Sequence, residues 1–404
     1  MLIQLSHGSV PRNLRGPILI SECRLPRYWA AVWSTVLAAS LADSTHLQKL
    51  RHIESLYQHA DRLYGKMAVL DNALGTLDDH ALAAILESWF VSIRNQTNTT
   101  RSDEIRWQTG LDFVSTIVKW VSKSQSDQLM RTIDARLQRL EMLYQQLHVT
   151  KATPIESVRS LPATTVQALY ETLDPESPQN PFLRIGTRWR VFISFILMLH
   201  QGLRRGEILL LPADGIKTAY DSKQDRHRYW INVQENPYEE AGTDSRYSKP
   251  SIKTAASIRQ IPVSEVTSNI IDTYVQNYRG RPNHSFLINS QSNMPFSTEA
   301  LTKSFAQVSS KLPAAVLKEL RDRTGKSSVT PHDLRHTCAV MRLHQMLQQG
   351  DSMDEALQKL RSFFGWSRTS TMPSRYARAV FEDRLATVWN DAFDERVALL
   401  RALP

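Results

Sequence analysis

Apolar residues in the first 150 positions recur at steps of three and four, the spacing of one face of an amphipathic α-helix. The clearest case runs from Ser44 to Tyr64 and is followed by Gly65, a residue typical of helix ends. Three further stretches share the pattern: Leu82 to Ile93, Ile105 to Val121 and Gln128 to Leu147. Polar residues separate them, as from Asn95 to Ser102. The pattern predicts an all-α bundle over residues 1–150.

A linker is expected next, because the stretch from His148 to Pro162 carries two prolines and several Ser and Thr residues without apolar periodicity. The pattern beyond it is mixed. Helices are predicted at Thr164 to Leu173, at Arg188 to Leu211, and from Thr298 onward. Strands are predicted at Tyr229 to Val233, Ser251 to Thr254, Ile258 to Val263 and Phe286 to Ile288. We therefore expect a multidomain chain whose second domain, residues 151–404, is α+β, mainly helical, with a small antiparallel sheet.

Length and composition agree with two folded domains. The chain has 404 residues, of which 42% are apolar and 22% charged, a balance that argues against extensive disorder. Lys and Arg number 49 against 40 Asp and Glu, and the net charge of +9 favours a polyanionic partner without identifying one. The longest apolar stretch, Val191 to Leu199, is far shorter than the roughly 20 residues that cross a bilayer. We predict a buried core helix there and no membrane partner.

The cysteines and histidines indicate neither a disulfide framework nor a metal site. Cys23 and Cys338 are far apart and lack zinc-ligand spacing, which fits a reducing, cytoplasmic location, near the nucleoid if the cell is bacterial. His332 and His336 have the spacing of a metal-binding pair, but position 333 is Asp and no third ligand lies at a fitting distance. We predict no metal and no cofactor.

The stretch from Thr330 to His336 predicts the start of a helix. Thr330 suits the N-cap, Pro331 the first helical position and Asp333 the first turn. His332 and Arg335 are three residues apart and share a face beside the positive end of that helix. Together they predict an anion site.

Three other stretches carry candidate chemistry. Arg204 follows the apolar helix in Gly202-Leu203-Arg204-Arg205-Gly206-Glu207, and a guanidinium is suited to bidentate phosphate contact. Lys253 lies in the first of two short strand patterns that small residues separate, near an expected hairpin tip. Trp366, in Gly365-Trp366-Ser367, is followed ten residues later by Tyr376, the only tyrosine after Tyr278.

The order of these residues resembles the active site of the tyrosine recombinase, or phage integrase, family. The residues concerned are Arg204, Lys253, His332, Arg335, Trp366 and Tyr376. Gly202 to Leu211 resembles the family's first-arginine motif, and Pro331 to Thr337 resembles its HxLRH motif. The pattern from Leu47 to Trp107 resembles its helical core-binding domain, so the resemblance spans most of the chain.

The resemblance implies that Tyr376 attacks a DNA phosphate and forms a 3′-phosphotyrosyl bond, without metal or ATP. Arg204 and Arg335 would hold the non-bridging oxygens, while His332 is the best candidate base. Lys253 would protonate the 5′ oxygen, and the Trp366 indole could donate to a phosphate oxygen. It further implies double-stranded DNA as partner, a homotetramer on DNA, a last helix from Ala379 to Leu403 docking on a neighbour, and accessory proteins in some settings.

Several alternatives remain open. The stretch before Lys253 is long, which suggests an insertion around Lys223 to Ser248 and leaves Lys249 as a rival for the lysine role. His336 is either a packing residue or a phosphate contact, and the last helix could pack on its own domain. A type IB topoisomerase and an inactive, DNA-binding accessory protein are the alternative functions.

Overall fold

The computed structural model describes most of the chain and divides it into two compact units, Met1–Pro154 and Ile155–Pro404. The residues described are 1–5, 16–37, 41, 43–96, 99–122, 131, 132, 135, 138, 139, 142, 160–239, 244, 246, 249–252, 254–377 and 380. None of the described helices combines the length and apolarity needed to span a bilayer.

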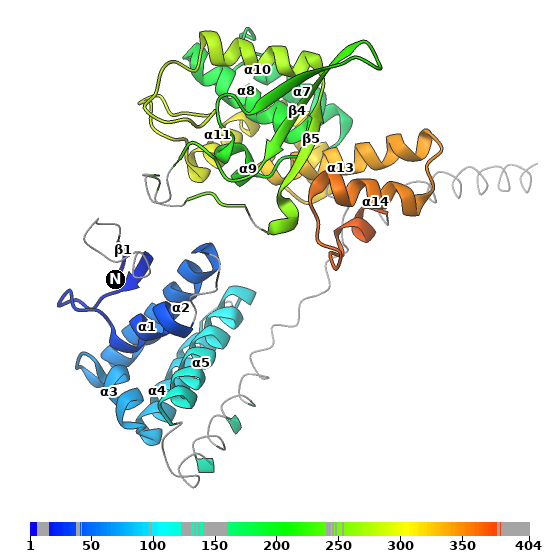
Figure 1. Ribbon diagram of the computed structural model, residues 1–404. Coiled ribbons are helices and arrows are strands. Elements are labelled where there is room, and N and C mark those ends of the chain that lie inside the picture. The colour runs from blue at the N-terminus through cyan, green and yellow to red at the C-terminus, as the bar shows by residue number, and fades with distance from the viewer. Residues whose placement is uncertain are drawn as a thin grey trace, which may run out of the picture. The chain divides into compact units, whose positions relative to one another are not determined.

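The first unit is a helical bundle with a small two-stranded sheet. Its helical elements are α1 (Tyr28–Val32), the π-helical turn η2 (Trp33–Leu37), α2 (Asp43–Tyr64), α3 (Val69–Thr76), α4 (Asp79–Arg94) and α5 (Arg101–Val121). The long helices α2, α4 and α5 pack on one another (Figure 1). They bury an aromatic and aliphatic core in which Trp107, Tyr57 and Phe113 are the largest fully buried side chains.

The helices predicted for α2, α4 and α5 are confirmed, and α2 ends at Gly65 in the left-handed conformation with φ of 62°. The all-α prediction was incomplete, because β1 (Leu2–Leu5) pairs antiparallel with β2 (Gly16–Leu19). These strands are too short for their alternation to stand out from the sequence. The helix predicted over Gln128 to Leu147 and the linker before Ser160 lie almost wholly outside the described residues.

The second unit combines eight described α-helices with one three-stranded antiparallel sheet. The helices are α7 (Ala163–Leu173), α8 (Ile185–His200), α9 (Arg205–Leu210), α10 (Glu265–Asn277), α11 (Thr298–Ser309), α12 (Ala314–Thr324), α13 (Pro331–Gln348) and α14 (Met353–Phe364). The apolar stretch of α8 is buried, as predicted for a core helix. Helix α13 packs against both α8 and α14 (Figure 1), and this arrangement positions the candidate site.

The sheet has the order β3-β4-β5, with β3 (Ile216–Asp221), β4 (Arg226–Val233) and β5 (Arg259–Val263). The register pairs Tyr229 with Val263 and Ile231 with Ile261, so alternate residues of β4 and β5 face the core. This confirms the predicted mainly helical α+β unit with a small antiparallel sheet.

Three details of the second unit differ from the predictions. The helix expected from Arg188 to Leu211 is two helices, because Gly202 adopts a left-handed φ of +59° between them. The segment from Phe286 to Ile288 is not a strand of the sheet. It forms an isolated β-bridge between Phe286 and Pro212 and a backbone hydrogen bond from Leu287 to Leu211. Of the predicted strand from Ser251 to Thr254, the described residues Ser251, Ile252 and Thr254 are not in a strand either, and a 3₁₀ turn, η4 (Ala255–Ser257), follows them in the connection between β4 and β5.

Candidate active site

Tyr376 lies in a short helical turn after α14, in the hydrophobic cluster that α13 and α14 form between them. Its ring stacks on Trp366, with centroids 5.4 Å apart and planes at 15°. Trp366 in turn stacks on Phe364 at 4.8 Å and 12°. The Tyr376 hydroxyl makes a hydrogen bond with Nδ1 of His336. The hydroxyl of the sequence-predicted nucleophile is therefore held by ring packing and by a histidine.

Helix α13 begins as predicted. The Asp333 carboxylate accepts hydrogen bonds from the Thr330 backbone N–H at 2.8 Å and from the Thr330 hydroxyl at 2.7 Å, and Pro331 occupies the first turn. His332 is exposed at the start of the helix, whereas His336, one turn later, is buried. The two rings meet edge to face, with centroids 4.2 Å apart. One turn of helix thus carries an outer and an inner histidine.

Arg335 is buried and lies between the C-terminal ends of two helices. Its guanidinium donates to the carbonyl oxygen of Gly202, just after α8, and from Nη2 to that of Phe364 in α14, at 2.8 Å. Carbonyls at helix C-termini lack partners within the helix, so they are natural acceptors for a cation. A guanidinium has five N–H donors, and these two contacts use two of them.

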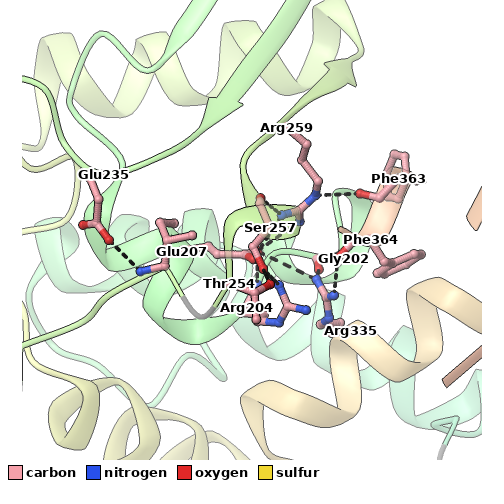
Figure 2. A network of polar contacts seen from close by, with 11 residues as sticks. Gly202, Arg204, Glu207, Glu235, Thr254, Ser257, Arg259, Arg335, Phe363 and Phe364 are labelled. Carbon is pink, nitrogen blue, oxygen red and sulfur yellow. Dashed lines mark hydrogen bonds and ion pairs between the residues drawn. The ribbon is translucent and has the colours of Figure 1, made fainter. Parts of the chain in front are cut away.

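Arg204 precedes α9 and is only partly covered by the protein. Its Nη1 donates to Glu207 Oε1 at 2.5 Å and to the Ser257 hydroxyl at 3.0 Å (Figure 2). The Glu207 carboxylate also lies 3.8 Å from Arg335 Nη1. Glu207 therefore joins the two arginines that the sequence predicted as phosphate ligands, and it is buried, as expected for a structural partner.

Arg259 is a third arginine of this cluster, and the sequence predictions missed it. Its Nη1 and Nη2 each donate to Glu207 at 3.0 Å, and its Nε donates to the carbonyl oxygen of Phe363 at 2.7 Å (Figure 2). Nη1 also donates to the Ser257 carbonyl oxygen at 2.7 Å. The signal that would have found it is alternation, because Arg259 shares the inward face of β5 with Ile261.

The cluster has an excess of positive charge. Three arginines surround one carboxylate, which leaves two positive charges in a largely buried place. Burial alone would raise the pKa of Glu207. The hydrogen bond and charge of Arg259, followed by the charges of Arg335 and Arg204, outweigh burial and hold that pKa below its usual range. An anion is the ligand that this charge distribution favours.

The surroundings of Arg335 lower the pKa of its guanidinium. Burial and then the charge of Arg204 lower the pKa of Arg335 to about 9, while the Tyr376 phenol acts in the opposite direction. The guanidinium is thus positively charged at neutral pH and close enough to Tyr376 for their charges to interact. A phenolate at Tyr376 would form beside a fixed positive charge.

The structure brings His332, Arg335, Trp366 and Tyr376 together around α13 and α14, with Arg204 beside Arg335. Trp366 is buried and packs on Tyr376 in this arrangement. Lys253 lies outside the described residues, as does nearly all of the expected last helix, Ala379 to Leu403. Lys249, the rival lysine, is exposed.

Thr254 belongs to the polar network around Arg204. Its hydroxyl lies 3.1 Å from that of Ser257, which accepts from Arg204 (Figure 2).

Within the described part of the chain, no group of three His, Cys, Asp or Glu side chains could hold a metal ion.

Gly202 permits the close packing behind Arg335. A Cβ at this position would lie 2.3 Å from Cε1 of Phe364, and the left-handed φ also disfavours any other residue. Gly202→Ala is therefore expected to lower the free energy of unfolding by roughly 1–3 kcal/mol. It should also displace the carbonyl that Arg335 contacts. Urea denaturation followed by circular dichroism measures the change.

Gly206→Ala is the matched control from the same motif. Its Cβ would meet nothing closer than 3.6 Å, and Gly206 is helical, so alanine is expected to be neutral or to stabilise by up to about 1 kcal/mol. Equal stability of the two variants would contradict the role given to Gly202.

Similarity to known proteins is found among solved structures and with a sequence family. No curated protein matches the sequence. Solved structures that match include XerA recombinase, at 14% identity over 84% of this chain and 98% of that chain, with a TM-score of 0.37. Lambda integrase bound to DNA matches at 13% identity over 87% of this chain and 95% of that chain, with a TM-score of 0.41.

The sequence profile described as "Phage integrase family" matches residues 159–383, which is more than half of the chain. The match contains α7 to α14, the sheet and Tyr376, so it includes every described residue of the site above. This chain therefore belongs to the phage integrase, or tyrosine recombinase, family.

Proposed function

We propose that this protein is a site-specific DNA recombinase that cleaves and rejoins strands through a covalent bond between Tyr376 and a DNA phosphate. The observation that carries the proposal is the position of the Tyr376 hydroxyl, on His336 and within electrostatic range of the charged Arg335. A nucleophile beside an arginine cluster with excess positive charge suits attack on a phosphodiester. Family membership supports the same reaction.

In the first step the phenol oxygen of Tyr376 attacks the scissile phosphorus, and the bond from phosphorus to the 5′ oxygen breaks. Negative charge grows on the non-bridging oxygens of the five-coordinate phosphorus. Arg204 and Arg335 would donate to these oxygens. In other enzymes a single donor of this kind contributes about 3–4 kcal/mol to the stability of the transition state.

The 5′ oxygen leaves as a hydroxyl and needs a proton, for which Lys253 is the proposed donor. The phosphotyrosyl bond retains the energy of the phosphodiester, so a 5′-hydroxyl from another strand reverses the step without ATP. Because the arginines supply the positive charge that metal ions supply in other phosphoryl-transfer enzymes, the proposed reaction needs no metal.

Strand exchange requires two duplexes in one complex, so the proposal includes a homotetramer on DNA. Residues 1–150 would form the core-binding domain that grips the duplex, and residues 151–404 the catalytic domain. The segment from Ala379 to Leu403 is the proposed contact between neighbours. Accessory DNA-binding proteins would determine the direction of exchange where they are present.

The test is a covalent-trapping assay. Nicked duplexes that tile the DNA flanking the gene are incubated with the protein in EDTA, because a nick next to the cleavage site lets the 5′ product diffuse away and prevents rejoining. We expect a detergent-resistant adduct, with the DNA attached to the peptide that contains Tyr376. Gel-shift binding to the same duplexes serves as the internal control.

Three outcomes are distinguishable. An adduct at Tyr376 on particular duplexes supports the recombinase. DNA binding without any adduct would instead favour an accessory protein that does not cleave. Relaxation of any supercoiled plasmid by the monomer would favour a type IB topoisomerase.

A further inference from the structure

Helix α13 carries one histidine, His336, that contacts Tyr376 and another, His332, that packs against His336. His336 is 4% exposed, and its Nδ1 makes the hydrogen bond with the Tyr376 hydroxyl. The ring planes of His336 and Tyr376 are tilted by 48°, with centroids 5.5 Å apart. His332 lies on the exposed side of His336, with its ring against the inner one.

We propose that His336, rather than His332, accepts the proton of Tyr376 when the phenol attacks DNA. This inference rests on the proposed recombinase function and assigns one step of it. His332, at the exposed start of α13, then faces the phosphate, as its place at the positive end of the helix suits.

The geometry supports this division of roles. A general base must lie within hydrogen-bond reach of the proton that it removes, and Nδ1 of His336 already meets this condition before DNA arrives. The stack on Trp366 restricts the phenol to the plane in which this contact forms. Because both residues are buried, water competes little for the phenol proton.

The step balances as follows. The Tyr376 oxygen forms its bond to phosphorus while its proton moves to Nδ1 of His336, which becomes an imidazolium. The bond from phosphorus to the 5′ oxygen breaks, and that oxygen takes a separate proton from the general acid. In the rejoining step the imidazolium returns its proton to the departing phenol oxygen, so His336 is restored.

The decisive variant is His336→Asn. The asparagine side-chain oxygen stands where Nδ1 stands, so it keeps an acceptor for the Tyr376 hydroxyl but cannot take up a proton. We expect single-turnover adduct formation to slow by about 10²–10⁴-fold, the usual contribution of a general base. Denaturation curves verify that the variant folds.

A second measurement separates loss of a base from loss of position. Tyr376 is replaced by a fluorotyrosine, whose phenol is more acidic and therefore depends less on a base. The fluorotyrosine should raise the rate of adduct formation in His336→Asn. This increase should exceed by about tenfold or more the change that the fluorotyrosine causes in a chain with His336 intact. His332→Asn should slow the reaction without any such selective rescue.

His200→Gln is the matched control. Nε2 of His200 makes a hydrogen bond with the Tyr170 hydroxyl, a second tyrosine–histidine pair, and glutamine places an acceptor near that nitrogen. This variant should change stability but keep the rate of adduct formation.

The outcomes test the role of His336 separately from the proposed recombinase function. Selective rescue of His336→Asn supports the inference. Any of three results would overturn the inference: a wild-type rate in His336→Asn, an equal effect of fluorotyrosine in all chains, or rescue confined to His332→Asn. In each of these cases, adduct formation by the wild type would still support the proposed recombinase function. A wild-type chain that forms no adduct would overturn both.

Discussion

Tyr376→Phe is expected to abolish adduct formation while leaving DNA binding unchanged. Phenylalanine keeps the ring that stacks on Trp366 and so preserves the packing of the cluster, but it removes the only atom that can bond to phosphorus. Loss of a catalytic nucleophile lowers turnover by roughly 10⁶-fold in a well-studied hydrolase, and a similar loss here would leave no detectable product. Trapping on nicked duplexes and gel-shift titration measure the two properties.

Tyr278→Phe is the control for this experiment. Tyr278 also stacks on a tryptophan, Trp189, with centroids 4.8 Å apart and planes at 13°. Tyr278→Phe therefore removes a hydroxyl from the same kind of stacked ring pair, but outside the candidate active site. This variant should cleave DNA like the wild type. Adduct formation by Tyr376→Phe would refute the assignment of the nucleophile.

Glu207→Gln should be the most destabilising change in the arginine cluster. The carboxylate accepts two hydrogen bonds from Arg259 and two from Arg204, one of them from the Arg204 backbone N–H at 2.8 Å. Glutamine removes the negative charge and turns an N–H₂ group toward other donors. Breaking a buried charge pair on one side typically costs 3–5 kcal/mol, and we expect a loss of about that size in the free energy of unfolding.

The pH dependence follows from the lowered pKa of Glu207. Because this pKa is lower in the folded chain than its ordinary value near 4.5, the carboxylate stabilises the fold at pH values above that value. The contribution is lost as the pH falls through the folded-state pKa. The difference in stability between the wild type and Glu207→Gln should thus be constant near neutral pH and shrink in acid. Urea denaturation at several pH values measures it.

Glu235→Gln is the matched control. Glu235 is exposed and accepts one hydrogen bond, from the Ile252 backbone N–H at 2.8 Å. Its replacement should cost less than about 1 kcal/mol, with little dependence on pH. A comparable loss in both variants would mean that the buried cluster contributes no more than a surface carboxylate.

The sequence was most informative where local chemistry determines the structure. Thr330, Pro331 and Asp333 fix the start of α13 within one turn, and that turn carries the spacing of His332 and Arg335. Such capping signals depend on residues a few positions apart, so no knowledge of the tertiary structure is needed to interpret them.

Predictions were less successful where a single residue interrupts a continuing pattern. Apolar periodicity runs on past Gly202, but the left-handed backbone there ends α8 and begins a separate helix at Arg205. The short run from Ser251 to Thr254 was predicted as a strand, although Ile252 is its only apolar residue. Four residues without a partner strand do not decide between a strand and an irregular connection.

Individual contacts between distant segments could not be predicted from spacing or periodicity. His336 and Tyr376 are 40 positions apart, and nothing in the spacing shows which of two histidines meets the hydroxyl. Arg259 was missed for a related reason, since its partners Glu207 and Phe363 come from elements that lie far from it in the sequence.

The ring stack of Phe364, Trp366 and Tyr376 has an entropic consequence. Fixing the rotamers of a long or aromatic side chain costs up to about 2 kcal/mol of conformational free energy. In this chain the Tyr376 side chain is already immobilised by the fold before any duplex is bound. This loss of conformational entropy therefore lowers the free energy of unfolding of the second unit. It does not lower the affinity for DNA when the phosphate reaches the site.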